Sequence, residues 1–214
     1  MDDTRSVRGT IRINCVGGYL GEELIAGMLC EFLQEYPDVN INLDFSSHRI
    51  DLIEDEFDLA FRMGKLEDAG FIARKLLDLT MVTLASPAYI ERYGDPEHPR
   101  ELSEHHCLSG SVKKWSYRNI HSPELSFDAQ IRGQLECKNG RVMLLGALAG
   151  NGIIRVPLIY CQQEVQQGRL RRVLKEWEIP DVEFSALYHR DRYQPNRLRT
   201  LIEFMKSYFE NLRG

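Results

Sequence analysis

Residues 57–93 constrain the fold of this chain more than any other stretch. They contain two apolar runs, FDLAFRMG and LTMVTLAS, with a charged, loop-like segment between them. The first run ends in a charge and a glycine, and the second ends in Ser-Pro at the start of a helical pattern. Because α/β proteins present ligand sites where buried strands end in polar turns, the stretch predicts two buried strands and a site wall at Arg62, Met63 and Gly64.

The residues before this stretch predict alternating strands and helices. Ile11, Ile13 and Cys15 alternate with polar residues, apolar residues then recur at helical spacing from Leu20 to Leu33, and residues 39–45 alternate again. Ser46-Ser47 is a candidate cap for a short helix that reaches Ile53. The order β-α-β-α-β predicts a parallel sheet with helices on its faces.

A change in composition at 86–94, reversed near 155–158, predicts an inserted second domain. The first domain then comprises residues 1–86 and 157–214, and the second comprises residues 87–156. Two crossings connect them, with hinges expected at Ser86, Pro87, Val156 and Pro157. Ligands bind in the cleft between two such lobes.

Shorter patterns predict the remaining elements. Strands are expected around residues 107–109, 117–119, 130–136, 153–156, 170–173 and 184–189. Helices are expected after a cap at Ser86, after a cap at Asn139, over about 158–167, and from Pro195.

The charge and the motifs argue against several function classes. The net charge is -5 and the basic residues are dispersed, so this chain alone is predicted to bind nucleic acid poorly. No apolar run approaches the roughly 20 residues of a membrane span, and the start MDDTRSVRG has no secretion-signal centre, so a cytoplasmic location is expected. No GxSxG, HExxH, P-loop or GxGxxG pattern is present, which argues against an enzyme.

Several residues allow two interpretations. The cysteines lack CxxC spacing, so reduced thiols are expected and no metal or cofactor. His105, His106 and His121 suggest a metal site or, more simply, solvated histidines. Trp115 and Tyr117 fit either a cleft wall or a small core.

The candidate ligand contacts are also ambiguous from sequence alone. Gly17-Gly18 precedes a helix, where it provides either an anion-binding turn or plain turn geometry. Arg62 and Arg155 each end an apolar strand. Their guanidinium groups would bind a carboxylate or phosphate, or form a salt bridge within the protein.

Taken together, these motifs resemble the effector-binding domain of LysR-type transcriptional regulators. FDLAFRMG and LTMVTLASPAYIERYG carry the resemblance, together with Pro99 to Cys107, which resembles the family's P-x-x-L-x-x-H-x-C. Further matches occur in the same order along nearly the whole chain: RGTIRIN at 8–14, FLQEYPDVNINL at 32–43, ALAGNGI at 147–153, GRL at 168–170 and the closing LRTLIEFMKSYF.

The resemblance implies an α/β fold with two Rossmann-like subdomains of periplasmic-binding-protein type II architecture, joined by two crossover strands. It implies a small-molecule effector in the interdomain cleft, self-association as a dimer or tetramer, and DNA binding only through an N-terminal winged helix-turn-helix that is absent from this chain. It places the effector contacts at Val16, Gly17, Gly18, Tyr19, Ser46, Ser47, His48, Arg62, Met63, Gly64, Ser109, Gly110, Ser111, Asn139 and Arg155.

Departures from the family pattern bear on the ligand. The first turn reads Val16-Gly17-Gly18-Tyr19 where relatives often carry Ser or Thr, and Arg155 occupies a position that is otherwise apolar. A charged residue there suggests either an anionic effector or a neutralised contact between the lobes. A stand-alone solute-binding protein of the same fold is the main alternative, and an enzyme on this fold is the second.

Overall fold

The computed structural model describes residues 7–45, 57–64, 71–190 and 194–213. The chain forms two compact units. Unit 1 comprises Met1–Asp78 with Glu183–Gly214, and unit 2 comprises Leu79–Val182. These boundaries differ from the predicted ones at 86/87 and 156/157. Residues 79–86 and 157–182 belong to unit 2 because strands of both segments pair within its sheet.

Unit 1 is built on a sheet whose described strands run in the order β2-β1-β3-β13-β4. The bounds are β1 Gly9–Cys15, β2 Val39–Asp44, β3 Leu59–Met63, β4 Phe71–Leu79 and β13 Val182–His189. β1 pairs in parallel with both β2 and β3, whereas β13 is antiparallel to β3. The predicted parallel sheet is thus confirmed for the opening strands. The predicted helix after Ser46 lies outside the described residues.

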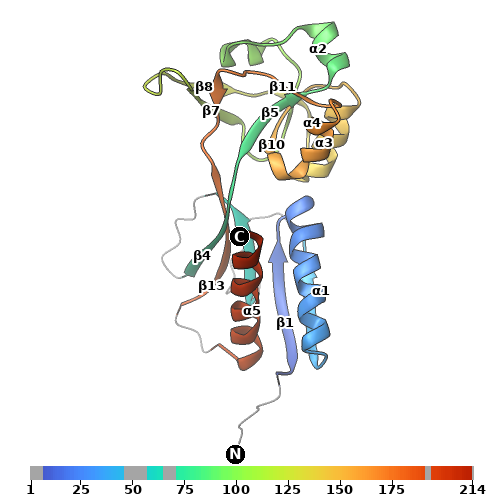
Figure 1. Ribbon diagram of the computed structural model, residues 1–214, viewed down its shortest axis with the longest axis vertical. Coiled ribbons are helices and arrows are strands. Elements are labelled where there is room, and N and C mark those ends of the chain that lie inside the picture. Colours follow the sequence, from blue (N-terminus) through green and yellow to red (C-terminus); the bar gives the residue numbers. More distant parts are fainter. Residues whose placement is uncertain (1–6, 46–56, 65–70, 191–193, 214) are drawn as a thin grey trace, which may run out of the picture. The chain divides into compact units, whose positions relative to one another are not determined.

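Two helices pack beside the unit 1 sheet, α1 (Ala26–Glu35) and α5 (Asn196–Arg213) (Figure 1). The rings of Phe32 on α1 and Phe204 on α5 meet edge to face at 5.4 Å. Ile11, Ile13, Phe61 and Met205 are fully buried between these elements. The apolar residues whose spacing predicted the last helix therefore form the face that this helix buries.

The first helix departs from its prediction at its start. A π-helical segment, η1 (Leu20–Ile25), precedes α1. Gly21 lies against the preceding turn so closely that an added Cβ would overlap the Val16 carbonyl oxygen and come within 2.7 Å of Phe45 Cε1. The wider coil and the missing side chain let the helix begin directly beneath the end of β1.

β4 was not predicted, because residues 65–78 were expected to form a loop. It lies at the edge of the sheet, where it pairs with one neighbouring strand, β13. Leu76 and Leu79 are buried in it, while Lys75 and Asp78 are exposed. The run LTMVTLAS was predicted as one strand, but Leu79 ends β4 and β5 (Met81–Ala85) starts a different sheet.

Unit 2 contains two described sheets, ordered β11-β5-β10-β6-β9 and β12-β7-β8. The bounds are β6 Cys107–Ser109, β7 Lys114–Asn119, β8 Ser126–Gln130, β9 Gly133–Glu136, β10 Ile153–Pro157, β11 Arg171–Arg172 and β12 Trp177–Glu178. The predicted strand 130–136 is wrong, because β8 pairs with β7 in one sheet and β9 pairs with β6 in the other. β12 was not predicted.

The helical segments of unit 2 are α2 (Pro87–Tyr93), η2 (Pro99–Ser103), α3 (Gly140–Leu148), η3 (Leu158–Tyr160) and α4 (Gln162–Gln166). Two of these helices, α2 and α3, start at the predicted caps Ser86 and Asn139. Ser86 Oγ accepts from the Tyr89 amide at 3.3 Å, and Asn139 Oδ1 accepts from the Arg141 amide at 2.9 Å. None of the described helices has both the length and the apolar composition that a membrane crossing needs.

We expect Gly21→Ala to lower the free energy of unfolding by about 1–3 kcal/mol, because the new methyl group must displace backbone. Gly27→Ala is the matched control, since Gly27 lies in α1 with open space around its Cα. That substitution should raise stability by about 1 kcal/mol through helix propensity. Urea unfolding measures both, and equal effects of the two variants would contradict the close approach at Gly21.

Candidate functional site

The candidate contacts of unit 1 gather where β1 and β3 end. Because these strands are parallel and Cys15 is in register with Phe61, the turn after Cys15 and the residues after Phe61 meet at the same edge of the sheet. Val16, Gly17, Tyr19, Arg62, Met63 and Gly64 are all half-buried there, and Gly18 is buried. Ser46, Ser47 and His48 lie outside the described residues.

Arg62 is the charged side chain among these half-buried residues. Its Nη1 donates to the Phe61 carbonyl oxygen at 2.8 Å, and no carboxylate forms an ion pair with it within the described part of the chain. Burial lowers the pKa of Arg62, which means that the charged form is deprived of solvent, and the neighbouring Cys15 counteracts this shift. The salt-bridge interpretation of Arg62 therefore finds no partner among the residues described.

Cys15 ends β1 beneath Arg62 and was not among the predicted contacts. Its side chain is fully buried, and burial raises the pKa of its thiol to about 12, although the positive charge of Arg62 opposes the shift. Asn14, fully buried beside it, donates from Nδ2 to Asp44 Oδ2 at 3.5 Å. In the sequence, Asn14 could have been recognised as a candidate because it is a polar residue inside a strand that was predicted to be buried.

The glycine turn has an internal partner. The Gly18 amide donates to Glu22 Oε1 at 2.9 Å, and the Glu22 amide donates to the Gly18 carbonyl oxygen at 2.8 Å. Gly18 has a positive φ of 85°, a conformation that favours glycine. An anion at this turn would have to displace the Glu22 carboxylate from the amide.

In unit 2 the predicted contacts Ser109, Gly110 and Asn139 lie close together. The Cys137 amide donates to the Ser109 carbonyl oxygen at 3.0 Å, and the Asn139 amide donates to Cys137 Sγ at 3.4 Å. Ser109 is fully buried, and its Oγ accepts from Lys113 Nζ at 3.0 Å. Lys113 also pairs with Glu136 at 2.7 Å, whereas Ser111 is exposed.

Arg155 lies in β10, paired in register with Thr83 of β5. Its Nε is buried and has no hydrogen-bond partner among the described residues, and burial lowers its pKa. Thr83 Oγ1 and Tyr117 Oη are 3.0 Å apart, and Tyr117 interacts electrostatically with Arg155. Tyr117 is 2% exposed, so it is both a core residue and a member of this polar cluster.

The two sets of unit 2 contacts share one face of the sheet. Cys107 and Ile153 belong to one buried cluster, while Leu108 and Ile154 belong to another. Since side chains alternate along a strand, Ser109 and Arg155 point to the same side as Cys107 and Ile153. The same polar face also contains Lys113, Thr83 and Tyr117. The sequence analysis had predicted only part of this set.

The predicted hinge residues all lie within unit 2. Ser86 and Pro87 start α2, and Val156 and Pro157 end β10. The chain passes between the units at Asp78–Leu79 and at Val182–Glu183 instead. The prediction that a ligand lies between two lobes, and the hinge role, stay predictions.

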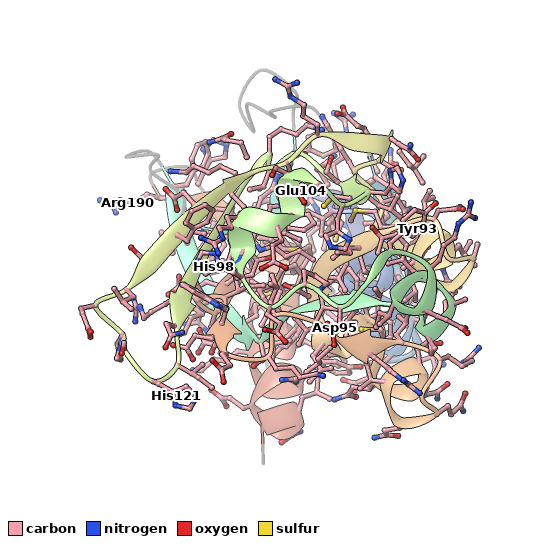
Figure 2. All side chains as sticks on the ribbon, turned by 90° about the horizontal axis from the view of Figure 1, so that it is seen from above. Tyr93, Asp95, His98, Glu104, His121 and Arg190 are labelled. Atoms are coloured by element: carbon pink, nitrogen blue, oxygen red, sulfur yellow. The ribbon has the colours of Figure 1, made fainter. Side chains whose placement is uncertain are left out.

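His105 and His106 share a hydrogen-bond partner, Tyr89, whereas His121 lies elsewhere. His105 Nδ1 lies 3.0 Å from Tyr89 Oη, which also accepts from the His106 amide at 3.0 Å. His121 lies at the tip between β7 and β8, well away from His98 (Figure 2), and its nearest carboxylate is Glu176 at 3.8 Å. No cluster of three metal-ligating side chains occurs among the described residues.

The buried thiols predict a loss of stability at alkaline pH. Burial raises the pKa of Cys15, Cys107 and Cys161 to about 12, whereas in the unfolded chain thiols titrate near their ordinary value of about 8.5. Their contribution is therefore complete below about pH 8.5 and decreases as the pH rises toward 12, because the unfolded state then ionises first.

Urea unfolding between pH 7 and pH 11 measures this decrease. Cys107→Ala should flatten the pH dependence, while the exposed Cys30→Ala should leave it unchanged. A profile that is flat in the wild-type chain, or equally steep in the Cys107 variant, would contradict the assignment.

The sequence and the fold were compared with known proteins. A family model described as the LysR substrate binding domain matches residues 4–210. The chain is 36% identical over 203 residues to an HTH-type transcriptional regulator of Xanthomonas campestris pv. campestris (strain 8004), covering 92% of this chain and 59% of that protein. It is 30% identical over 202 residues to the HTH-type transcriptional activator AaeR of Escherichia coli (strain K12), covering 94% and 65%. The chain thus spans less than two thirds of either relative.

Solved structures of LysR-type transcriptional regulators have similar folds. The full-length structure of the Vibrio cholerae virulence activator AphB, a member of the LTTR family, matches with a TM-score of 0.84 and 29% identity over 96% of this chain and 70% of that chain. The regulatory domain of CrgA from Neisseria meningitidis, a LysR-type transcriptional regulator, matches with a TM-score of 0.78 and 25% identity over 94% and 99%.

These similarities confirm the fold class and the family, and the solute-binding alternative is not favoured because the similar proteins are transcriptional regulators rather than transporters or enzymes. The chain belongs to the LysR substrate-binding-domain family of transcriptional regulators.

Proposed function

We propose that this chain is the sensing domain of a transcriptional regulator and that its effector is a small anionic metabolite. The carrying observation is the pair Arg62 and Arg155, one in each unit, both partly buried and neither ion-paired among the described residues. A guanidinium group that has lost solvent without gaining a carboxylate is costly, and an anion would offset that cost with two parallel hydrogen bonds.

The neighbours of each arginine support the same ligand class. Around Arg62, the turn after β1 supplies backbone amides and the ring of Tyr19, and an anion there would replace the Glu22 carboxylate on the Gly18 amide. Around Arg155, Thr83, Tyr117, Ser109 and Lys113 contribute hydroxyl and ammonium groups that donate hydrogen bonds to an oxyanion. No nucleophile paired with a general base is found in these groups, which supports binding rather than catalysis.

Regulation then follows from differential affinity. An effector that binds one arrangement of the protein more tightly than another shifts the population between them, with a coupling of roughly 1–3 kcal/mol. In the whole protein we assign DNA binding to a separate helix-turn-helix part and the location to the cytoplasm, where the DNA lies. The names of the similar HTH-type regulators support this assignment.

A thermal-shift screen of small carboxylates identifies the ligand, because a molecule that binds only the native state raises the melting temperature. Calorimetry with that ligand then tests the arginines. We expect Arg62→Gln and Arg155→Gln each to weaken binding by about tenfold or more, the loss of one charge-assisted contact. Arg12→Gln in β1 and Arg118→Gln in β7 are matched controls, since both side chains are exposed strand arginines.

The controls should bind like the wild-type chain, and all four variants should retain the circular dichroism spectrum of the folded protein. If neither Arg62→Gln nor Arg155→Gln weakens binding while the fold persists, the anionic-effector proposal is wrong.

Self-association is a separate part of the proposal. We expect light scattering to report a dimer or larger species at micromolar concentrations, because regulators of this family are expected to act as symmetric assemblies. A strict monomer at the highest soluble concentration would contradict this part without affecting effector binding.

A further inference from the structure

A buried tyrosine in unit 2 is bonded to two neighbouring histidines. Tyr89 lies in α2 and is 1% exposed. Its Oη lies 3.0 Å from His105 Nδ1 and accepts a hydrogen bond from the His106 backbone amide, also at 3.0 Å. These three groups, the Tyr89 clamp, join α2 to the segment between η2 and β6.

The direction of each hydrogen bond in the clamp follows from the chemistry of its groups. A backbone amide can only donate, so Tyr89 Oη is the acceptor for His106. The hydroxyl hydrogen of Tyr89 then needs an acceptor of its own, and among the described residues that acceptor is His105 Nδ1. Leaving this hydrogen unbonded in a buried position would cost free energy. His105 Nδ1 therefore carries no proton, and the neutral ring carries its proton on Nε2.

Protonation of His105 is incompatible with this arrangement. In the charged ring both nitrogens are donors, so Nδ1–H and the Tyr89 O–H would direct two hydrogens toward one another. One of the two groups then loses its hydrogen-bond partner, and the burial of Tyr89 makes that loss costly. The clamp is closed with a neutral His105 and is broken by a charged one.

The groups around the clamp favour the same protonation states. Burial lowers the pKa of His105, and His106 adds to the shift, whereas the carboxylates that oppose it are Glu101, Glu104 and Asp95. Burial raises the pKa of Tyr89, the His106 amide opposes this shift, and Cys107 and Tyr93 add to it. The phenol therefore keeps the hydrogen that it donates, and the imidazole is held in its neutral form.

His106 lies at a junction of the unit 2 sheet. Its carbonyl oxygen accepts from the amide of Ile153, the first residue of β10, at 2.8 Å. Gly152 passes so close that an added Cβ would lie 2.5 Å from that oxygen. β6 begins one residue later, at Cys107, and pairs in parallel with β10. The clamp thus holds the residue at which two neighbouring strands start.

We propose that the Tyr89 clamp is a pH-sensitive switch, closed while His105 is neutral and opened when acid protonates His105, which loosens the starts of β6 and β10. β6 ends at Ser109, and β10 carries Arg155. The regulatory consequence, that acid weakens the face assigned to the effector, rests on the proposed function. The switch itself does not.

The pH range of the switch follows from the direction of the shift. In the folded chain the pKa of His105 lies below its ordinary value of about 6.5. As the pH falls, the unfolded chain therefore binds a proton at this residue first. The stabilisation by the clamp is complete above about pH 6.5 and is lost as the pH falls through the folded-state pKa.

Nuclear magnetic resonance of the whole chain, with 15N-labelled histidine, tests the protonation of His105. At about pH 8 we expect the proton on Nε2 and none on Nδ1. In Tyr89→Phe, which keeps the ring and removes the hydroxyl, His105 should titrate at a higher pH than in the wild-type chain, because the neutral ring loses the hydrogen bond that favours it. A proton on Nδ1, or an equal titration midpoint in the two chains, would overturn the proposal.

His105→Asn replaces the switch with a group that does not titrate. The Asn Oδ1 takes the place of Nδ1 and accepts from Tyr89 at every pH. In urea unfolding, this variant should lose less stability than the wild-type chain between about pH 8 and about pH 5.5. His106→Asn is the matched control, since His106 bonds to Tyr89 through its backbone amide, and it should keep the wild-type pH dependence. The proposal is wrong if His105→Asn behaves like the wild-type chain or if both variants flatten the profile equally.

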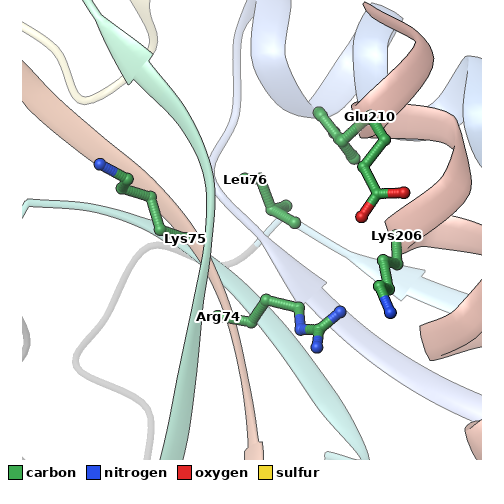
Figure 3. Close-up of a pocket in the computed structure, with 6 residues that line it drawn as sticks. Arg74, Lys75, Leu76, Lys206 and Glu210 are labelled. Atoms are coloured by element: carbon green, nitrogen blue, oxygen red, sulfur yellow. The ribbon is translucent and has the colours of Figure 1, made fainter. Parts of the chain in front are cut away.

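Hydrogen exchange tests whether the effect is local. Between about pH 7.5 and about pH 5.5, the protection of the Ile153 amide should fall by about threefold to tenfold in the wild-type chain and by less than about twofold in His105→Asn. The Lys206 amide in α5 of unit 1 (Figure 3) is the internal reference, and its protection should be equal in both chains. An equal fall at Lys206 and Ile153 would indicate general acid unfolding and contradict a local switch. None of these measurements uses the effector, so the switch is tested independently of the anionic-effector proposal.

Discussion

Parallel pairing of β1 with both β2 and β3 is the constraint on which unit 1 depends. The register from Gly9–Val39 to Asn14–Asp44 on one side, and from Ile13–Leu59 to Cys15–Phe61 on the other, brings three strand ends to one edge. Every group that we assign to the unit 1 site lies at that edge. The antiparallel β13 then places Ser185 opposite Arg62 and leads the chain back toward α5.

Burial of charge without a matching carboxylate is the feature that the two units share. Arg62 is the last but one residue of β3, whereas Arg155 lies in the middle of β10 rather than at its predicted end, and burial removes solvent from both guanidinium groups. In unit 2 the Thr83 and Tyr117 hydroxyls bond to one another, and Arg155 Nε has no hydrogen-bond acceptor among the described residues. A protein that only needed stability would be better served by an apolar residue at such positions.

Much of the architecture could be predicted from local pattern. Alternation identified β1 and β2, an apolar run identified β3, helical spacing identified α1 and α5, and the caps at Ser86 and Asn139 are formed as expected. The edge strand β4 was missed because its one-sided burial leaves charged residues in the sequence and hides the alternation. The break between β8 and β9 was missed because pairing partners far along the chain, rather than the residues themselves, divide that segment between two sheets.

The sequence by itself determined the family, the opening strands and helices, and the apolar strands that carry Arg62 and Arg155, because motifs and periodicity are local properties. Only the tertiary structure decided which groups those arginines meet, including the Thr83 and Tyr117 hydroxyls near Arg155. Those contacts join residues that lie far apart along the chain, so they depend on sheet register and packing, which no short window of sequence encodes.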